Sequence, residues 1–286
     1  MTVLVGRWQM ESDPGEDLSF DWDSAGGINA WAAAHPGAGV YEADRTYPGP
    51  RILKFDEHLD RLEASARREG LPLDVDRDRF RSVLRELAER AVAAAGGALT
   101  DDSVRFLVRV PETRPHEIEF VVEPFRPPAP ELYERGVFCA TMSGARREHP
   151  EAKTSSWMSD RQAFTLPDGA FDGLLVSERG EILEGATTNF YAVVDGELWT
   201  ADEGILFGIA RQIVIEVAPT VLPVRLQPIH IETELPKVSE AFLTSSSRAV
   251  LPICRIDDTE LGPRGPVTDR IARAYRDWVD AHLRPL

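Results

Sequence analysis

Lys153, in the polar stretch EAKTSSW, is the residue whose type most clearly suggests chemistry. The chain has only three lysines, Lys54, Lys153 and Lys237, whereas the other 29 of its 32 basic residues are arginines. A lysine amine can lose its proton when it is desolvated and then act as a nucleophile, but a guanidinium stays protonated. A lysine at this place therefore indicates a nucleophilic amine, with a solvated surface lysine as the alternative.

Three further segments carry groups that could hold a charged ligand. Glu184, in EGATTN, offers a carboxylate that could pair with a protonated ring nitrogen. In GIARQIV, Gly208 precedes a predicted helix whose first amides, at Ile209 and Ala210, form a phosphate site. Residues 244–247 are four consecutive hydroxyl side chains, which can bind a phosphate or a carboxylate. For EGATTN and for the hydroxyl run, an ordinary polar turn is the commoner alternative when each segment is considered alone.

The composition limits the class of partner. The net charge of −16 argues against nucleic acid and against an anionic membrane surface, since both would be repelled. No apolar run approaches the length of a membrane span, and the start does not resemble a signal peptide, so a cytoplasmic location is expected. Cys139 and Cys254 are too few and too far apart for a metal site, and no metal is expected.

Strand and helix patterns are mixed without strict alternation, which indicates an α+β protein. The first 125 residues predict strands at 2–10, 39–47, 103–110 and 116–125, helices at 55–70 and 76–96, and an acidic, Gly-rich loop between the first two strands. The later residues predict a strand at 137–143, a helix after Lys153, several strands within 173–200, a strand within 240–253, and helices at 208–218 and 267–283.

The stretch EPFRPPAPELYERG has four prolines, a composition typical of a stiff connector that joins neither a helix nor a central strand. We therefore expect a smaller N-terminal α/β domain (1–123), a linker (124–134) and a larger C-terminal domain (135–286).

The order of these motifs resembles that of the class IV, or fold type IV, pyridoxal-phosphate aminotransferases, which include branched-chain and D-amino-acid aminotransferases and aminodeoxychorismate lyase. The resemblance runs from GVYEADRTY to GPVTDRIARAY, most of the chain. FDEHLDRL resembles the phosphate-arginine motif, with its arginine at Arg61, and AKTSSW resembles the Schiff-base lysine segment. EGATTN resembles the segment that pairs with the pyridine nitrogen, GIARQIV the phosphate helix, and Ser246 falls where the family places a phosphate-binding threonine.

The resemblance implies a pyridoxal 5'-phosphate enzyme that is a homodimer, with its active site near the domain boundary. Lys153 would form the Schiff base and move the proton between the substrate and the cofactor. Glu184 would pair with the pyridine nitrogen. Cofactor phosphate would be held by four groups: Arg61, Ile209, Ala210 and Ser246. The sequence departs from the family at Trp157 and Met158, where branched-chain enzymes have a tyrosine, and at Ala210, where a threonine is common.

The substrate is indicated by RVPETRPHEIEF. There Arg114 and His116 resemble the carboxylate trap of D-amino-acid aminotransferases, with Tyr41 in the matching third position. Alternate residues of an extended segment point the same way, so both side chains could converge on one anion. Arg45 is a rival, because branched-chain enzymes carry a substrate-binding arginine on that strand, and Ser247 is a further candidate.

The leading expectation is transamination between an amino acid, with a preference for D-amino acids, and a 2-oxo acid. A branched-chain L-amino-acid aminotransferase and an aminodeoxychorismate lyase, which forms 4-aminobenzoate and pyruvate, are the alternatives. All would use Lys153 and Glu184.

Overall fold

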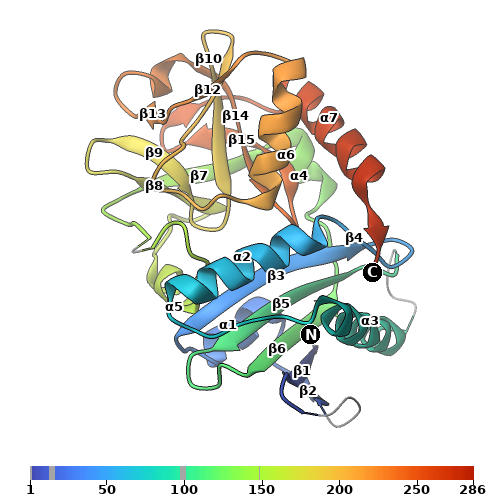
Figure 1. Ribbon diagram of the computed structural model, residues 1–286. Coiled ribbons are helices and arrows are strands. Elements are labelled where there is room, and N and C mark those ends of the chain that lie inside the picture. Colours follow the sequence, from blue (N-terminus) through green and yellow to red (C-terminus); the bar gives the residue numbers. More distant parts are fainter. Residues whose placement is uncertain (1, 13–16, 97–100, 148) are drawn as a thin grey trace. The chain divides into compact units, whose positions relative to one another are not determined.

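The computed structural model describes residues 2–12, 17–96, 101–147 and 149–286, and its Cα packing divides the chain into two compact units. The first unit consists of Met1–Arg126, Ala152–Phe164 and His282–Leu286. The second consists of Pro127–Glu151 and Thr165–Ala281. Both units contain helices and sheets, as the α+β expectation requires (Figure 1).

This division differs from the expected continuous C-terminal domain. The segment that carries Lys153 and the last five residues both belong to the first unit. The Pro-rich stretch lies at the change of unit, but it contains a helix, α4 (Pro130–Arg135). Pro130 starts that helix, where its missing N–H costs nothing.

The first unit is built on a seven-stranded sheet with the order β17–β4–β3–β5–β6–β1–β2. Its strands are β1 (Val3–Gln9), β2 (Leu18–Asp23), β3 (Gly39–Tyr47), β4 (Arg51–Ile52), β5 (Val104–Pro111), β6 (Glu117–Pro124) and β17 (Arg284–Pro285). Its helices are α1 (Ile28–Ala34), α2 (Phe55–Arg68), α3 (Arg77–Ala94) and α5 (Ser155–Asp160), followed by a 3₁₀ turn at Arg161–Ala163.

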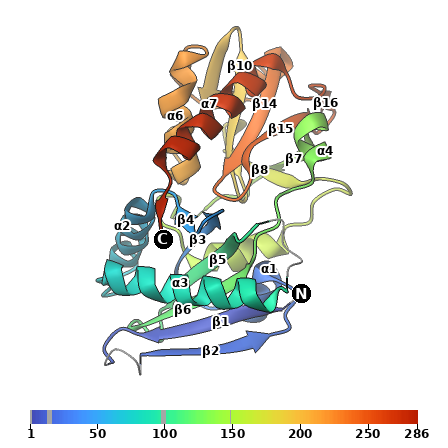
Figure 2. The same ribbon diagram turned by 90° about the vertical axis from the view of Figure 1, so that its right-hand side faces the viewer.

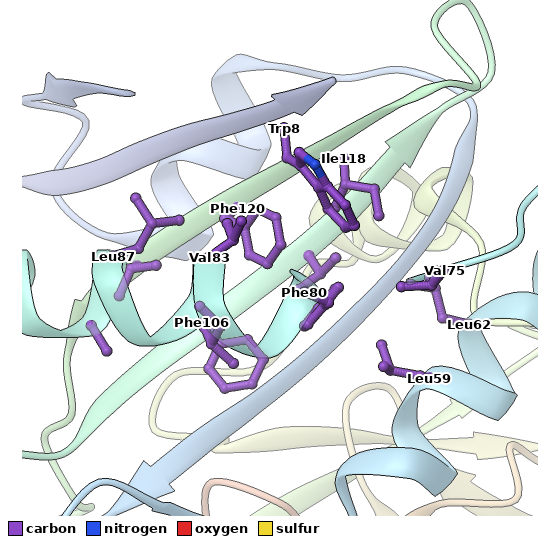
Figure 3. Close-up of a cluster of buried hydrophobic side chains, with 14 of the residues drawn as sticks. Trp8, Leu59, Leu62, Val75, Phe80, Val83, Leu87, Phe106, Ile118 and Phe120 are labelled. Carbon is purple, nitrogen blue, oxygen red and sulfur yellow. The ribbon is translucent and has the colours of Figure 1, made fainter. Parts of the chain in front are cut away.

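One face of this sheet carries α2 and α3, and α3 runs across β6 and β1 (Figure 2). The core beneath them is apolar and aromatic, with Phe80 of α3 near Trp8 and Phe120 of the sheet (Figure 3). Helix α2 forms where the sequence predicts it, since Leu59, Leu62 and Ala66 recur at helical spacing and are buried.

The opposite face is covered by α1 and α5, which lie against Tyr41, Leu107 and Val121. Both α1 and β2 fall in the region expected to be a loop, so that expectation was wrong. Partners distant in the chain hold α1, because its first amide, Ile28 N, donates to Glu123 at 3.0 Å and Arg109 donates to the carbonyl of His35. Sequence-local patterns do not contain such contacts.

The second unit is built on a sheet with the order β12–β11–β10–β14–β15–β7–β8–β9–β13, with β16 beside β15. Strand β9 also pairs with β10, so the strands β10–β14–β15–β7–β8–β9 close into a ring. The strands are β7 (Val137–Ser143), β8 (Asp172–Val176), β9 (Glu181–Gly185), β10 (Asn189–Val194), β11 (Glu197–Thr200), β12 (Val224–Leu226), β13 (Ile229–His230), β14 (Val238–Ser245), β15 (Ala249–Ile256) and β16 (Thr259–Glu260). Besides α4, its helices are α6 (Ile209–Val217) and α7 (Pro266–His282, whose last residue is in the first unit), with 3₁₀ turns at Ala218–Thr220 and Leu235–Lys237.

Candidate active site

Lys153 is fixed by its main chain to two elements of the first unit. Its carbonyl accepts a hydrogen bond from Tyr41 N at 2.9 Å, and its amide donates to Ser65 Oγ of α2 at 3.1 Å. The next residue, Thr154, forms a β-bridge with Val40, and α5 begins directly after it. The amine of Lys153 lies 4.8 Å from the centroid of the Tyr41 ring. Strand β3 and helix α2 thus orient the side chain of the expected nucleophile.

Arg61, the expected phosphate arginine, is held by a buried carboxylate. Its Nε and NH2 atoms each donate to an oxygen of Glu42 at 2.8 Å, which is a bidentate ion pair. His58 Nδ1 lies 2.8 Å from the same carboxylate. Since Glu42 directly follows Tyr41, one short stretch of β3 contacts both Lys153 and Arg61.

Burial and the charges in this cluster shift the pKa values of two carboxyl groups in opposite directions. Burial alone would raise the pKa of Glu42, but Arg61, His58 and Lys153 outweigh it and hold that pKa well below its ordinary value. Burial raises the pKa of Asp44, and the nearby His58 opposes this only in part. His58 Nε2 is 3.3 Å from Asp44 Oδ2, an ion-pair distance, yet this oxygen has no hydrogen-bond partner among the described residues.

The sequence analysis missed Glu42, Asp44 and His58. A signal was present, because two acidic residues at alternate positions of GVYEADRTY point to one face of a strand. His58 and Arg61 are three apart on α2, so they share the helix face that meets these acids.

Glu184, in the second unit, is 1% exposed and lies at the closure of the strand ring, where it pairs with Asn189. Its carboxylate accepts hydrogen bonds from Arg147 Nε at 2.7 Å, Asn189 Nδ2 at 3.2 Å and Leu206 N at 3.2 Å. Hydrogen bonds donated to a carboxylate favour its ionised form. Neither Arg147 nor Asn189 was among the expected site residues.

The rest of EGATTN is fixed by Asp172. One carboxylate oxygen of Asp172 accepts from the hydroxyls of Thr187 and Thr188, each at 2.9 Å. These bonds satisfy the threonines inside the unit and keep the turn between β9 and β10 in one conformation.

Helix α6 begins at Ile209, as the sequence predicts, and Gly208 immediately precedes it. A Cβ atom at Gly208 would lie 2.3 Å from Oδ1 of Asn189, so a side chain does not fit there. Asn189 Nδ2 also donates to the carbonyl of Leu206 at 2.8 Å. The same asparagine therefore positions both Glu184 and the start of α6, where the amides of Ile209 and Ala210 lack helical acceptors.

The hydroxyl run divides between two roles. Thr244 Oγ1 lies 3.3 Å from the hydroxyl of the buried Tyr191, inside the unit. Ser245 Oγ is buried and has no hydrogen-bond partner within the described part of the chain. Ser246 and Ser247 follow in the turn between β14 and β15. The unsatisfied hydroxyl is thus one residue before the serine that the sequence favours.

The substrate candidates on the β5–β6 connection do not form the expected extended pair. This connection is a double turn, in which Arg114 binds Glu117 and Glu119, each at 2.7 Å, and remains 48% exposed. His116 instead pairs with Glu11 at 3.0 Å. The premise that both side chains point the same way was wrong, because Pro115 lies in a turn rather than in a strand.

Arg45, the rival, lies between two aromatic rings. Its guanidinium carbon is 4.0 Å from the centroid of Tyr47 and 4.3 Å from that of Phe125. Tyr47 is two residues beyond Arg45 toward the C-terminal end of β3, whereas Tyr41 lies toward its N-terminal end. The guanidinium of Arg45 therefore points along the strand away from the contact with Lys153.

Residues 39–256 match the family model for amino-transferase class IV. A D-alanine aminotransferase of Listeria monocytogenes is 30% identical over 296 residues, which cover 98% of this chain and 96% of the relative. A probable branched-chain-amino-acid aminotransferase of Thermotoga maritima is 29% identical over 250 residues, covering 84% of this chain and 86% of the relative. The crystal structure of the T.th. branched-chain amino acid aminotransferase with pyridoxamine 5'-phosphate is 24% identical, has a TM-score of 0.74, and is matched over 88% of this chain and 91% of that one.

The chain belongs to the class IV aminotransferase family. It is a pyridoxal-phosphate-dependent transaminase with the type IV fold, acting on an amino acid and a 2-oxo acid, as expected from the motifs.

The residues fit this cofactor. A buried carboxylate with three donors suits a protonated ring nitrogen, while a helix start that excludes a Cβ and an unsatisfied serine hydroxyl suit a phosphate. Within the described residues, no cluster of three or more His, Cys, Asp or Glu side chains could bind a metal ion. None of the helices described is long and apolar enough to cross a membrane.

Proposed function

We propose that the protein transfers the amino group of a D-amino acid to a 2-oxo acid, with Lys153 as the catalytic base. The observation that carries the assignment of Lys153 is its fixed geometry, with the main chain bonded to Tyr41 and the amine 4.8 Å from the Tyr41 ring. The preference for D-amino acids is supported by the D-alanine aminotransferase relatives and by the partly exposed guanidinium of Arg114.

When bound, pyridoxal phosphate supplies an electron sink for the carbanion at the substrate's α-carbon. Lys153 would take the proton from that carbon and deliver it to the cofactor, since its amine is the basic group that β3 and α2 hold in place. Glu184, kept ionised by its donors, would hold a proton on the cofactor's ring nitrogen. Arg61, the amides of Ile209 and Ala210, and a hydroxyl of 244–247 would bind the phosphate.

Arg114 would bind the substrate carboxylate in competition with its own ion pairs. A substrate carboxylate would compete with Glu117 and Glu119 for the guanidinium, whose exposed part gives access. Tyr41 would be the third group of the trap, and His116 would join it only by exchanging its partner Glu11 for the substrate. Arg45 and Ser247 are the corresponding groups if the donor is a branched-chain L-amino acid, the alternative that the Thermotoga relative supports.

The test compares D-alanine and L-leucine as donors with one 2-oxo acid acceptor. The wild type should convert the D-amino acid with the higher kcat/KM, and Lys153→Ala should abolish the reaction. Lys237→Ala is the matched control, since Lys237 is an exposed lysine in a 3₁₀ turn and belongs to none of these motifs. Residual turnover by the Lys153 variant would overturn the role of this lysine.

Arg114→Ala tests the trap separately. Loss of a hydrogen bond to a charged group costs about 1.5–3 kcal/mol, so KM for D-alanine should rise roughly 10- to 100-fold. Arg126→Ala, at an exposed arginine of the same unit, should leave KM unchanged. Preferential use of L-leucine, with kinetics insensitive to Arg114→Ala, would favour the branched-chain alternative.

The homodimer expected from the resemblance is also part of this proposal, as is the cytoplasmic location. Sedimentation velocity of the purified protein measures the first directly. An active monomer would contradict it.

A further inference from the structure

The buried ion pair between Arg147 and Glu184 has a consequence for the chemistry of this family. Arg147 is 8% exposed, and its Nε donates to Oε1 of Glu184 at 2.7 Å. The other two donors, Asn189 Nδ2 and Leu206 N, bind Oε2 and are uncharged. Of these three donors, Arg147 is therefore the charged one.

A carboxylate buried this deeply needs such a partner to stay ionised. Taking an isolated carboxylate out of water costs several kcal/mol, and the group takes up a proton unless a cation or several donors compensate. The neutral donors orient Glu184, but the guanidinium supplies the opposite charge. Without it, a proton shared between Glu184 and a basic ring nitrogen would move toward Glu184.

We propose that Arg147 is a positioning residue for transamination, which keeps Glu184 ionised and thereby keeps the proton on the cofactor's ring nitrogen. This inference rests on the proposed pairing of Glu184 with that nitrogen. Arg147 lies in the loop after β7, six residues before Lys153. A charged cofactor ring withdraws electrons more strongly than a neutral one, so the arginine acts on the reaction rate through Glu184.

The structure offers a matched pair of arginines for the experiment. Arg147→Gln removes the buried charge but keeps hydrogen-bonding capacity. Arg146→Gln removes the neighbouring charge, whose side chain is 79% exposed and lies 3.8 Å from Glu178. Arg147→Lys restores the charge without the forked geometry, and serves as the second variant if Arg147→Gln does not fold.

In the holoenzyme, Arg147→Gln should lower kcat about 10- to 100-fold and leave KM for the amino donor unchanged. Losses of this size are typical at metal sites when a residue that holds a metal-binding side chain in place is replaced. Arg147→Lys should recover part of the rate, and Arg146→Gln should match the wild type. In Arg147→Gln, the pH midpoint of the bound cofactor's visible absorption should move upward. The reason is that an unprotonated cofactor ring withdraws less electron density, so the side-chain nitrogen of Lys153 that is bonded to the cofactor holds its proton up to a higher pH.

The pair must also act as one unit. Glu184→Gln combined with Arg147→Gln should have about the same kcat as Glu184→Gln alone, because the arginine then has no carboxylate to hold ionised. Thermal unfolding of the cofactor-free variants should show the same non-additivity, a readout independent of turnover.

Arg147→Gln with a lower melting temperature but wild-type kcat and absorption midpoint would overturn the inference and leave Arg147 a purely structural residue. Additive losses in the double variant would also overturn it. Failure of the proposed function has a different signature: the wild type would then show no lysine-dependent cofactor band, as judged against Lys153→Ala.

Discussion

At the scale of single residues, the candidate site is defined by buried carboxylates whose ionisation is controlled by their neighbours. Glu42 is paired with Arg61, and Glu184 with Arg147, in both cases by a guanidinium whose hydrogen bonds are 2.7–2.8 Å long. At Asp44, two residues from Glu42 on the same face of β3, burial outweighs the nearby His58 and raises the pKa. Stability should therefore depend on pH differently at these two positions of one strand.

Replacing Glu42 with Gln should destabilise the protein most at neutral pH. The folded-state pKa of Glu42 lies below its ordinary value of 4.5, so its stabilisation is present above that pH and is lost as the pH falls. The difference in melting temperature between the wild type and the variant should therefore shrink as the pH is lowered from about 7 to about 3. Thermal unfolding followed by circular dichroism measures it.

Replacing Asp44 with Asn should have the opposite pH dependence. Because its folded-state pKa lies above the ordinary 3.8, the stabilisation is present below that pH and is lost as the pH rises through the folded value. The Asn variant lacks this loss, so its melting temperature relative to the wild type should increase from about pH 4 to about pH 8. If the melting temperatures of both variants, relative to the wild type, changed with pH in the same direction, burial and charge would not shift the pKa values of Glu42 and Asp44 in opposite directions.

At the scale of elements, the junction between β10 and α6 ties two parts of the site together. Asn189, the first residue of β10, contacts Glu184 on one side and the approach to α6 on the other. Its Oδ1 occupies the space that a side chain at Gly208 would need. The geometry of the phosphate helix thus depends on a strand residue and on the absence of a Cβ.

Gly208→Ala should disturb the junction between β10 and α6 and lower both stability and cofactor affinity. The added Cβ must displace Asn189, and overpacking of this kind costs about 1–3 kcal/mol of stability. The start of α6 would shift too, so the dissociation constant for pyridoxal phosphate should rise as well. Equilibrium dialysis and urea unfolding measure the two effects. Gly37→Ala is the control, because no atom lies within 4 Å of a Cβ there. Equal cofactor affinity in both variants would contradict a role for this junction.

Elements with a strong local pattern could be predicted from the sequence, and those fixed by distant partners could not. The periodicity of α2 and α3 and the apolar strands β5 and β6 are visible in the chain. Strand β2 does alternate Leu18, Phe20 and Trp22 with polar residues, a strand pattern that the sequence analysis overlooked. Helix α1, by contrast, depends on Glu123 and Arg109 of distant strands. Of the candidate site, the motif order indicated Lys153, Arg61 and Glu184, but not the buried partners that hold the last two. The alternate acids of GVYEADRTY were a signal for Glu42, whereas the partner of Glu184, Arg147, has no local signal.

At the scale of the whole molecule, the chain passes between its units four times, after residues 126, 151, 164 and 281. Composition marked the first passage, because prolines gather there. The others lie in segments of ordinary composition. Their placement follows from contacts such as the bridge between Val40 and Thr154, which joins residues more than a hundred positions apart.

The C-terminal tail should contribute measurably to the first unit. Leu286 is 2% exposed in its core, and β17 extends the sheet beside β4. Leu286→Ala should lower the free energy of unfolding by about 2–5 kcal/mol, the usual cost of truncating a buried leucine. Arg284→Ala, at an exposed position of the same strand, should change it by less than about 0.5 kcal/mol. Chemical unfolding measures the free energy for both variants. Equal decreases in the free energy of unfolding would show that burial of Leu286 does not stabilise the unit.

The path of the chain also sets an order of assembly during synthesis. Ribosomes deliver the N-terminus first, and domains generally fold as their residues emerge. The second unit ends at Ala281, whereas the first needs β17 and Leu286 to complete its sheet and core. The half of the enzyme that starts first is therefore finished last. Until residues 282–286 have emerged, the nascent polypeptide carries its lysine on a sheet that still lacks an edge strand.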